Sequence, residues 1–600
     1  MTAGGYFGRA LLVEVSAQTV SSRRLDISER VLRSYLGGVG LGTWLMHRLA
    51  PTQIDPLAPA APLAFVFSPL VGTPLTTSAK FAVVAKSPLT GLLTDALASS
   101  QFAIAGKLTG HDAIVLRGRA DELSVVLIDG GDARVESARD LAGLPAAEAE
   151  ARLRERFGRG WRTAAIGPAG ERSVRYATVS HDGRHAGRGG LGAVLGAKNI
   201  KAVLVRAATK VAVADSPAVL QAARDLRKRS FGPATAKYRE LGTLANLLAF
   251  NAVSTLPTRN FTAATFEGAS QLAAEQLHDM RAVARHSCAS CSIGCEHIYS
   301  RKGGGHQRME YENVFALGPL CGVSDPDDVF AASAKCDELG IDTISAGGTI
   351  AWAMECVERG LLDAPWLRFG DGAALLRALD AIGSTEPGLG ELLAQGSRRA
   401  AATVGHDSIE FAPQVKGLEL PGYEPRTLQS MALGLAVNAR GADHNRSGAY
   451  EADLSGDLDR LAGGAAHVAA AIATEDRAAV MDSMILCKFL RGVFTEPFIE
   501  WAALLRAVTG WAVDADELQD TARRIVRAKR AFNIREGATA EDDRLPARML
   551  STPLQLASGR TATLPAERLQ SMIHSYYAAR GLDEAGRVAP GDLADLLLDA

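Results

Sequence analysis

The strongest constraint on the fold is a change in hydrophobic pattern near residue 210 of the 600-residue chain. Before this point, apolar runs of strand length, rich in Val, Ile and Ala, recur between Gly, Pro, Asp and Ser residues. After it, apolar residues recur at three- and four-residue spacing in longer segments rich in Ala, Leu and Arg, which is typical of amphipathic helices. Because strands and helices are segregated along the chain, the sequence predicts an α+β fold rather than a series of βαβ units.

This pattern divides the chain into three expected domains. A β-rich domain is expected over residues 1–210, and two mainly helical domains over residues 211–418 and 419–600, because Pro and Gly interrupt the helical pattern at 420–426. The expected strands lie at 63–72, 80–87, 112–118, 123–129, 176–183 and 201–207. The expected helices lie at 41–49, 146–157, 216–229, 458–473, 497–510 and 517–533.

Composition excludes several classes of protein. Lys and Arg total 65 and Asp and Glu total 67, so the chain has no overall charge that would attract nucleic acid or an anionic membrane. No apolar run reaches the roughly 18–20 residues of a membrane span, and the N-terminus lacks the pattern of a signal peptide. Seven unevenly spaced cysteines favour a reducing compartment over a disulfide scaffold. We therefore expect a cytoplasmic protein with no membrane span and no nucleic-acid partner.

Three cysteines form a compact array of the form C-x2-C-x3-C, at Cys288, Cys291 and Cys295. Thiolates at this spacing can face one point, and such soft ligands bind iron–sulfur clusters, zinc or Cu(I). Such a centre usually has four protein ligands, so a fourth ligand is expected from Cys487, Cys321 or His297. A structural zinc site of the Cys3His type, using His297, remains an alternative at this point.

Two glycine-rich segments have different expected roles. The segment 37–42, GGVGLG, follows no clear strand, so we interpret it as a turn before a helix rather than a dinucleotide-binding loop. The segment 183–203 combines several glycines with Arg, His and Lys, which suits a phosphate-binding loop. On composition alone, a glycine-rich hairpin with solvated cations explains that second segment equally well.

Several segments together resemble the tungsten-containing aldehyde:ferredoxin oxidoreductase family. CASCSIGC at 288–295 is similar to the cluster motif of this family, and HAGRGGLGAVLGAKNIKAV at 185–203 to its pterin-phosphate loop. CDELGIDTISAG at 336–347 and MDSMILCKF at 481–489 are similar to its two Asp-containing elements. Further landmarks, LPTRNF, LPGYEPR, FNIREG and EDDRLPAR, follow in family order. The resemblance therefore covers nearly the whole chain.

The resemblance implies a tungsten, or less often molybdenum, ion held by the dithiolenes of two pterins. It further implies a nearby [4Fe–4S] cluster and a magnesium ion that bridges the pterin phosphates. In this fold the N-terminal β domain forms a cofactor-binding base, two helical domains lie over it, and the metal sits at the domain junction. The implied partners are a small aldehyde substrate and a ferredoxin or iron–sulfur subunit; a homodimer is compatible with the family.

The resemblance also assigns site residues. The cluster ligands would be Cys288, Cys291, Cys295 and Cys487, the last two lying in different helical domains. The pterin contacts would be Lys80, His185, Ala186, Gly187, Arg188, Asp337, Ile341, Asp342, Arg440, Arg446, Asp482 and Leu486. Ionised Asp side chains can accept hydrogen bonds from pterin N–H groups, although helix capping is the simpler explanation for either Asp element taken alone.

Glu312 and His444 match positions that face the metal in this family. A carboxylate there could activate water, and a histidine could hold the substrate oxygen or move a proton. Taken without the resemblance, both would be ordinary helix or loop residues. Cys321 could be a thiolate ligand of the metal, as in the benzoyl-CoA reductase branch, but a buried inert cysteine is the simpler interpretation.

The leading hypothesis is oxidation of an aldehyde to a carboxylic acid, with electrons passed singly through the cluster to an iron–sulfur acceptor. Two departures from the family pattern keep alternatives open. Ile485 replaces a glycine in the second Asp element, and residues 95–103 read DALASSQFA where the family has a different stretch. One alternative keeps the cofactor but acts on a thioester, an acid or another small molecule. The other is an electron-transfer subunit that has lost the pterin.

Overall fold

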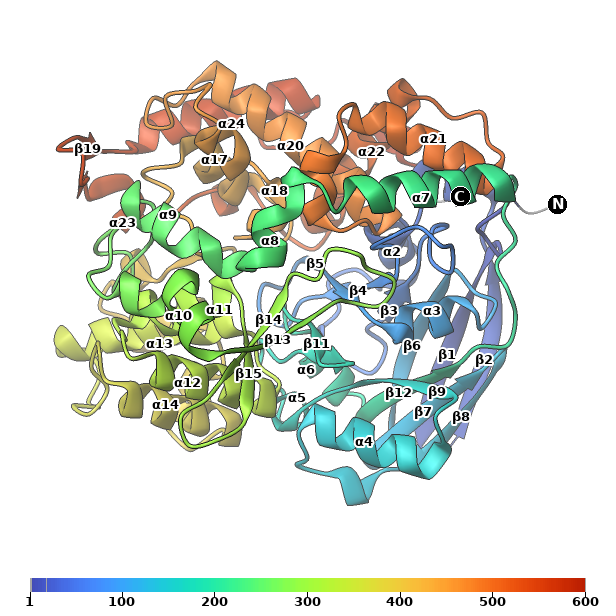
Figure 1. Cartoon of the computed structure of the whole chain (residues 1–600), viewed down its shortest axis with the longest axis horizontal. Helices are drawn as coiled ribbons and strands as arrows, with labels where there is room; N and C mark the ends of the chain where they lie inside the picture. Colours follow the sequence, from blue (N-terminus) through green and yellow to red (C-terminus); the bar gives the residue numbers. More distant parts are fainter. Residues whose placement is uncertain (1–2, 18, 599–600) are drawn as a thin grey trace.

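The N-terminal third of the chain forms two six-stranded sheets in the computed structural model, which describes residues 3–17 and 19–598 (Figure 1). The first sheet has the order β2-β1-β6-β3-β4-β5 and contains β1 (Arg9–Ala17), β2 (Thr19–Asp26), β3 (Leu63–Val66), β4 (Lys80–Lys86), β5 (Leu93–Ser99) and β6 (Ala113–Ala120). The second has the order β11-β10-β9-β12-β7-β8 and contains β7 (Ser124–Asp129), β8 (Asp132–Ser137), β9 (Trp161–Ala165), β10 (Val179–His181), β11 (Arg184–Ala186) and β12 (Ile200–Arg206).

Alternation of side chains along the strands buries both faces of the first sheet. On β6, Ile114 and Leu116 belong to the core shared with the second sheet, whereas Val115 belongs to the core beneath the helices. Successive strand residues point to opposite faces, so one apolar run can serve two cores. The continuous apolar runs recognised in the sequence are therefore those of strands covered on both sides.

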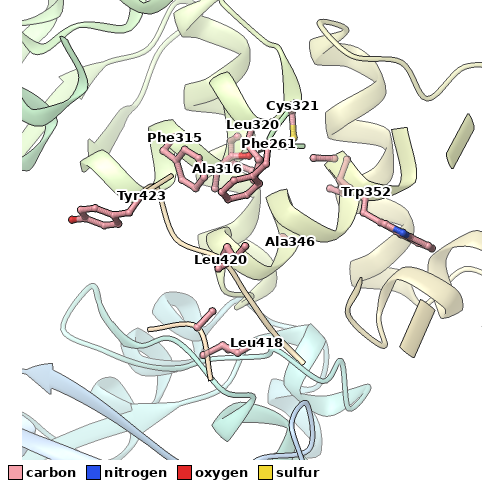
Figure 2. Packing of buried hydrophobic residues seen from close by; sticks show 14 of the residues in the cluster. Phe261, Phe315, Ala316, Leu320, Cys321, Ala346, Trp352, Leu418, Leu420 and Tyr423 are labelled. Atoms are coloured by element: carbon pink, nitrogen blue, oxygen red, sulfur yellow. Dashed lines mark hydrogen bonds between the residues drawn. The ribbon is translucent and has the colours of Figure 1, made fainter. Parts of the chain in front are cut away.

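Helices from distant parts of the chain cover the outer face of the first sheet. They are α2 (Gly38–Leu49), α20 (Ala465–Met484), α21 (Pro497–Thr509) and α22 (Ala515–Arg535). A larger helical core lies beside the sheets and includes α11 (Tyr311–Leu317), α12 (Pro326–Leu339), α13 (Thr343–Glu358), α14 (Gly372–Ser384), α17 (Gln429–Val437) and α24 (Ala566–Arg580). Figure 2 shows Phe315, Trp352 and Tyr423 of this core.

The predicted α+β class is confirmed. Each of the six predicted strand segments contains a strand, namely β3, β4, β6, β7, β10 and β12, and the helices predicted at 146–157 and 216–229 are α4 (Ala146–Phe157) and α7 (Ser216–Arg229). The helix predicted from residue 458 begins only at Ala465, because Gly463 and Gly464 both adopt positive φ angles. The division of the chain at residues 210 and 418 stays a prediction.

Three small sheets of the described chain lie outside the predicted β region, and the largest of them has three strands. It consists of β13 (Ala282–His286), β14 (Glu296–Ser300) and β15 (His306–Met309), and the cysteine array forms the connection between its first two strands. Its strands are polar and β13 is largely exposed, so they lack the apolar signal by which strands are recognised. Among the described residues, no helix is both long and apolar enough to cross a membrane.

The end of α20 approaches the start of α2 closely. A Cβ atom at Gly38 would lie 2.3 Å from the carbonyl oxygen of Asp482, so only glycine fits at this position of the GGVGLG segment. The segment is predicted as a turn before a helix at 41–49, but residues 38–42 already belong to α2, so the helix begins three residues earlier than predicted. Ile485 ends α20 in the left-handed region, with φ +64°, and its buried side chain packs against Gly38.

This conformation of Ile485 generates a test of stability. A non-glycine residue in the left-handed region costs about 1–2 kcal/mol. Ile485→Ala and Ile485→Gly both remove the buried side chain, at a cost of about 2–5 kcal/mol. Only glycine also removes the cost of the left-handed backbone conformation. We expect Ile485→Gly to unfold at higher denaturant concentration than Ile485→Ala. The control is Ala469→Gly within α20, where glycine should lower the stability of the protein relative to alanine. If the glycine variant were the more stable of the two at both sites, the argument would be contradicted.

Candidate active site

A cavity of about 360 Å³ lies where the first sheet meets the helices. The residues that line it come from β4, β5, the loop after β11, the cysteine loop, the segment before α20 and the end of α20. Predicted site residues that line it are Lys80, His185, Gly187, Arg188, Cys288, Cys295, Arg440, Arg446, Asp482, Leu486 and Cys487. Residues from four distant regions of the sequence therefore share one cavity.

Three of the four predicted cluster cysteines, Cys288, Cys295 and Cys487, line this cavity, and Cys291 lies in the same loop as the first two. All four are free thiols. Burial raises the pKa of Cys291 to about 11 and holds that of Cys295 well above its usual value, and repulsion from Cys487 adds to both shifts. Thr77 connects the two segments: its backbone N–H donates to the Ser290 carbonyl at 2.8 Å, and its hydroxyl accepts from the Cys487 N–H at 3.4 Å. Sequence analysis missed Thr77, for which no local signal exists.

The arrangement of the thiols differs from a single-ion site. His297, the zinc alternative, lies on β14 with its ring Nε2 3.2 Å from the carbonyl oxygen of Tyr238. Across the described part of the chain, no three His, Cys, Asp or Glu side chains meet closely enough to hold one ion. His297 therefore already has a partner within the protein, and the described side chains form no single-ion site.

A buried charge network lies beside the cavity, and three of its members, Arg446, Asp482 and Lys488, line it. Arg446 pairs with Asp95 of β5 and, at 3.2 Å, with Asp482 of α20. Lys529 of α22 lies 3.1 Å from Asp95, and Lys488 lies 3.0 Å from Asp482. Burial opposes ionisation of Asp95, but its cationic partners outweigh this and hold its pKa well below the usual range. Asp95 and Lys488 were not predicted, although Lys488 directly follows Cys487.

Nearby thiols and carboxylates shift the pKa values of Lys80 and Lys488, which both line the cavity. Burial alone lowers the pKa of Lys80, but the thiolates of Cys487 and Cys288 and the Asp482 carboxylate together raise it. Burial lowers the pKa of Lys488 to about 8, in spite of the attraction of Asp482. The two lysines therefore differ in how firmly each holds its proton.

Two polar features of the cavity have no partner within the described part of the chain. The Nε atom of Arg440 is buried and donates no hydrogen bond, whereas the Oδ2 atom of Asp482 has its ion pair with Arg446 and no hydrogen bond besides. At Gly187 a Cβ atom would meet nothing within 4 Å, so the backbone is open to the cavity. Buried polar groups are nearly always satisfied, so these atoms fit contacts to a polar ligand.

The other predicted pterin residues have partners inside the protein. Asp337 pairs with His185 at 3.1 Å; burial opposes its ionisation, yet the attraction of His185 lowers the pKa of Asp337 to about 2. Asp342 caps the N-terminus of α13 and lies 3.3 Å from Nε of Arg188. Ala186 and Ile341 lie beside these pairs without lining the cavity. The Asp residues thus orient two cavity side chains, and direct pterin contacts by them stay a prediction.

Glu312 and His444 lie next to each other. Nδ1 of His444 is 3.5 Å from Oε1 of Glu312, and Glu312 also accepts the N–H of Gly422 at 3.1 Å. Burial raises the pKa of Glu312 to about 8 and lowers that of His444 to about 3. Neither Glu312 nor His444 lines the cavity, although the sequence neighbours of His444, Asp443 and Asn445, do. At neutral pH this is an uncharged pair, with the proton on the carboxyl group.

Cys321 is packed among apolar side chains of the helical core (Figure 2). Its thiol donates toward the carbonyl oxygens of Ala316 and Gly347, and burial raises its pKa far above the usual range. It does not line the cavity. Its surroundings are those of an inert buried cysteine.

Comparison with known families agrees with this architecture. A family model described as the aldehyde ferredoxin oxidoreductase N-terminal domain matches residues 10–207, and one described as domains 2 and 3 of the same enzyme matches residues 220–598. The chain belongs to the aldehyde ferredoxin oxidoreductase family. The resemblance predicted from the sequence, and with it an oxidoreductase class, is confirmed.

Individual relatives span the whole length of this family member. It is 33% identical over 607 residues to the tungsten-containing aldehyde ferredoxin oxidoreductase of Pyrococcus furiosus, covering 99% of each chain. It is 26% identical over 623 residues to the WOR-like subunit of an aliphatic sulfonate oxidoreductase from the same organism, covering 97% of this chain and 95% of that one. The active site complex BamBC of benzoyl-coenzyme A reductase has the same fold, with a TM-score of 0.84, 23% identity and coverage of 99% and 97%.

The raised pKa of Glu312 generates a pH-dependent prediction. Its pKa is 4.5 ordinarily and about 8 when folded, so its contribution to stability is complete below about pH 4.5 and is lost as the pH rises through 8. Glu312→Gln cannot ionise and escapes this loss. We expect its melting temperature, relative to wild type, to increase between pH 5 and pH 9. Glu410→Gln on the surface controls for the removal of a carboxyl group, and an unchanged difference for Glu312→Gln would contradict the prediction.

Proposed function

We propose that this protein is a tungsten or molybdenum bis-pterin oxidoreductase that oxidises an aldehyde to a carboxylic acid. The observation that carries the proposal is that three of the four predicted cluster thiols, a buried charge network and the unpartnered Nε atom of Arg440 meet at one cavity. Family membership and the names of tungsten-containing relatives support the same cofactor. The cytoplasm remains the expected location.

We assign a [4Fe–4S] cluster to Cys288, Cys291, Cys295 and Cys487. The proposed electron acceptor is a ferredoxin or iron–sulfur subunit, since such clusters transfer one electron at a time. The Asp482 carboxylate, which lines the cavity, and the unpartnered Nε atom of Arg440 would contact pterin polar groups. Arg188, Arg446 and the open backbone at Gly187 would contact phosphate, with magnesium held at the phosphates near Leu97 of β5.

The departure at Ile485 does not obstruct this cavity. The Ile485 side chain is fully buried against α2, while its neighbour Leu486 lines the cavity. The bulky residue thus lies in the apolar core and leaves the space beside Asp482 open. This geometry favours the pterin-containing enzyme over an electron-transfer subunit that has lost the pterin.

When bound, the metal–pterin group would accept the two electrons released as an aldehyde and water become a carboxylic acid and protons. The protein supplies the proton chemistry beside it. With a pKa near 8, Glu312 is mostly protonated at neutral pH, and its ionised fraction, which grows as the pH approaches 8, can take a proton from water. His444 is neutral at that pH and would hydrogen-bond the substrate oxygen.

A second candidate keeps this site and changes the substrate. The sulfonate oxidoreductase relative and the benzoyl-coenzyme A reductase neighbour carry names with non-aldehyde substrates on the same fold. A thioester, an acid or another small molecule would then replace the aldehyde. Reduction of a dye by a panel of aldehydes separates the two candidates.

The cluster assignment predicts a specific loss of iron. Cys487→Ser removes the one ligand that comes from the far end of the chain, so we expect iron to fall well below four atoms per chain and the reduced-cluster EPR signal to change or vanish. Cys321→Ser is the matched control, because Cys321 lies in the apolar core. Full iron content and an unaltered signal in Cys487→Ser would contradict the assignment.

The reaction itself is tested on anaerobically purified protein. We expect tungsten or molybdenum near one atom per chain, and dye reduction that depends on an aldehyde. Glu312→Gln should keep both metals yet lower kcat by roughly 10²–10⁴, the usual contribution of a general base. No response to any aldehyde in metal-replete protein would favour the second candidate, and normal kcat in Glu312→Gln would remove that residue from the mechanism.

A further inference from the structure

The four predicted cluster thiols do not all face the same space. Cys288, Cys295 and Cys487 line the cavity, whereas Cys291 does not. The next residue, Ser292, has its hydroxyl 2.7 Å from the hydroxyls of both Thr76 and Ser230. Ser230 caps the C-terminus of α7, so the Cys291 side of the loop lies against the end of this helix.

The surface around this side is open to solvent. Phe231, directly after α7, is 51% exposed, and the guanidinium of Arg239 lies 5.5 Å from the centre of its ring. Arg239 belongs to α8 (Ala236–Glu240), and Nη1 of Arg285 on β13 donates to its carbonyl oxygen at 3.2 Å. The end of α7, α8 and β13 therefore meet beside the cysteine loop, on the face shown in Figure 1.

This surface is strongly cationic in a chain that is nearly neutral overall. Residues 224–240 contain six Lys or Arg residues and only two carboxylates, Asp225 and Glu240. Asp225 pairs with Arg229, which also pairs with Glu500. Within the described chain, no carboxylate forms an ion pair with any other cation of the patch, which comprises Arg227, Lys228, Arg239 and Arg285. Their charge is therefore available to an outside partner.

We propose that the patch formed by Arg227, Lys228, Phe231, Arg239 and Arg285 binds the electron acceptor, and that this acceptor is a small acidic iron–sulfur protein. The inference rests on the proposed function, because it requires the cluster on the four cysteines. Unpaired cations steer an acidic partner and set its encounter rate, while an exposed aromatic side chain anchors it at the centre of the contact. An acceptor bound to this patch lies on the Cys291 side of the thiols, which is the side that does not line the substrate cavity.

The test uses charge reversal on the intact holoenzyme. Arg227→Glu/Lys228→Glu removes two exposed cations from the last turn of α7, and Arg23→Glu/Arg159→Glu makes the same charge change at exposed sites of the β domain. The probe is a purified acidic bacterial-type ferredoxin, whose Kd is measured by calorimetry at low and at high salt. We expect the α7 variant to bind at least about tenfold more weakly at low salt and to lose much of its salt dependence. The control should change by less than about twofold.

Further readouts separate this inference from the function on which it rests. Iron content and aldehyde-dependent dye reduction should be unchanged in the α7 variant, while KM for ferredoxin rises. An unchanged Kd with normal dye reduction would overturn the docking surface alone, and so would equal binding of a basic redox protein. No dye reduction in wild type would overturn the proposed function instead. Arg285→Glu repeats the test from β13, should the α7 variant fail to fold.

Discussion

The cavity depends on the buried pairing of Asp95, Arg446 and Asp482. These side chains come from β5 and, more than 300 residues later, from α18 (His444–Ser447) and α20, which lie close together in the sequence. A buried charge without its partner costs several kcal/mol, so each element is stable in this position only when the other two are present. The network thus fixes a sheet and two helices around a polar space that apolar packing alone would close.

The same network determines where the cysteines lie. Asp482 and Cys487 stand on either side of the sharp turn at Ile485, so fixing Asp482 against Arg446 also fixes the direction in which the chain leaves α20. Thr77 then holds this segment beside the cysteine loop through hydrogen bonds to both. The unusual conformation of Ile485 is maintained because its side chain fills the gap against α2.

Local sequence patterns predicted those parts of the fold whose signal is local. Continuous apolar runs identified β3, β4 and β6, because these strands are buried on both faces, whereas the half-polar β2 and β13 gave no such run. The spacing of Cys288, Cys291 and Cys295 likewise indicated a shared ligand. The role of Asp95 could not be predicted, since nothing near it in the sequence identifies Arg446 as its partner. For the same reason, sequence alone did not reveal that Asp337 and Asp342 meet His185 and Arg188.

The electrostatics of the cavity also separate the roles of Glu312 and His444. With pKa values near 8 and near 3, a proton placed between them stays on the carboxyl group, and its transfer to the imidazole costs several kcal/mol. Burial produces this order, whereas Arg188 lowers the pKa of both groups without pairing with either. His444 is therefore suited to hold an oxygen atom as a neutral group and poorly suited to carry a proton. Proton transfer beside the cavity falls to Glu312, while Arg446 and Lys488 remain paired with their carboxylates.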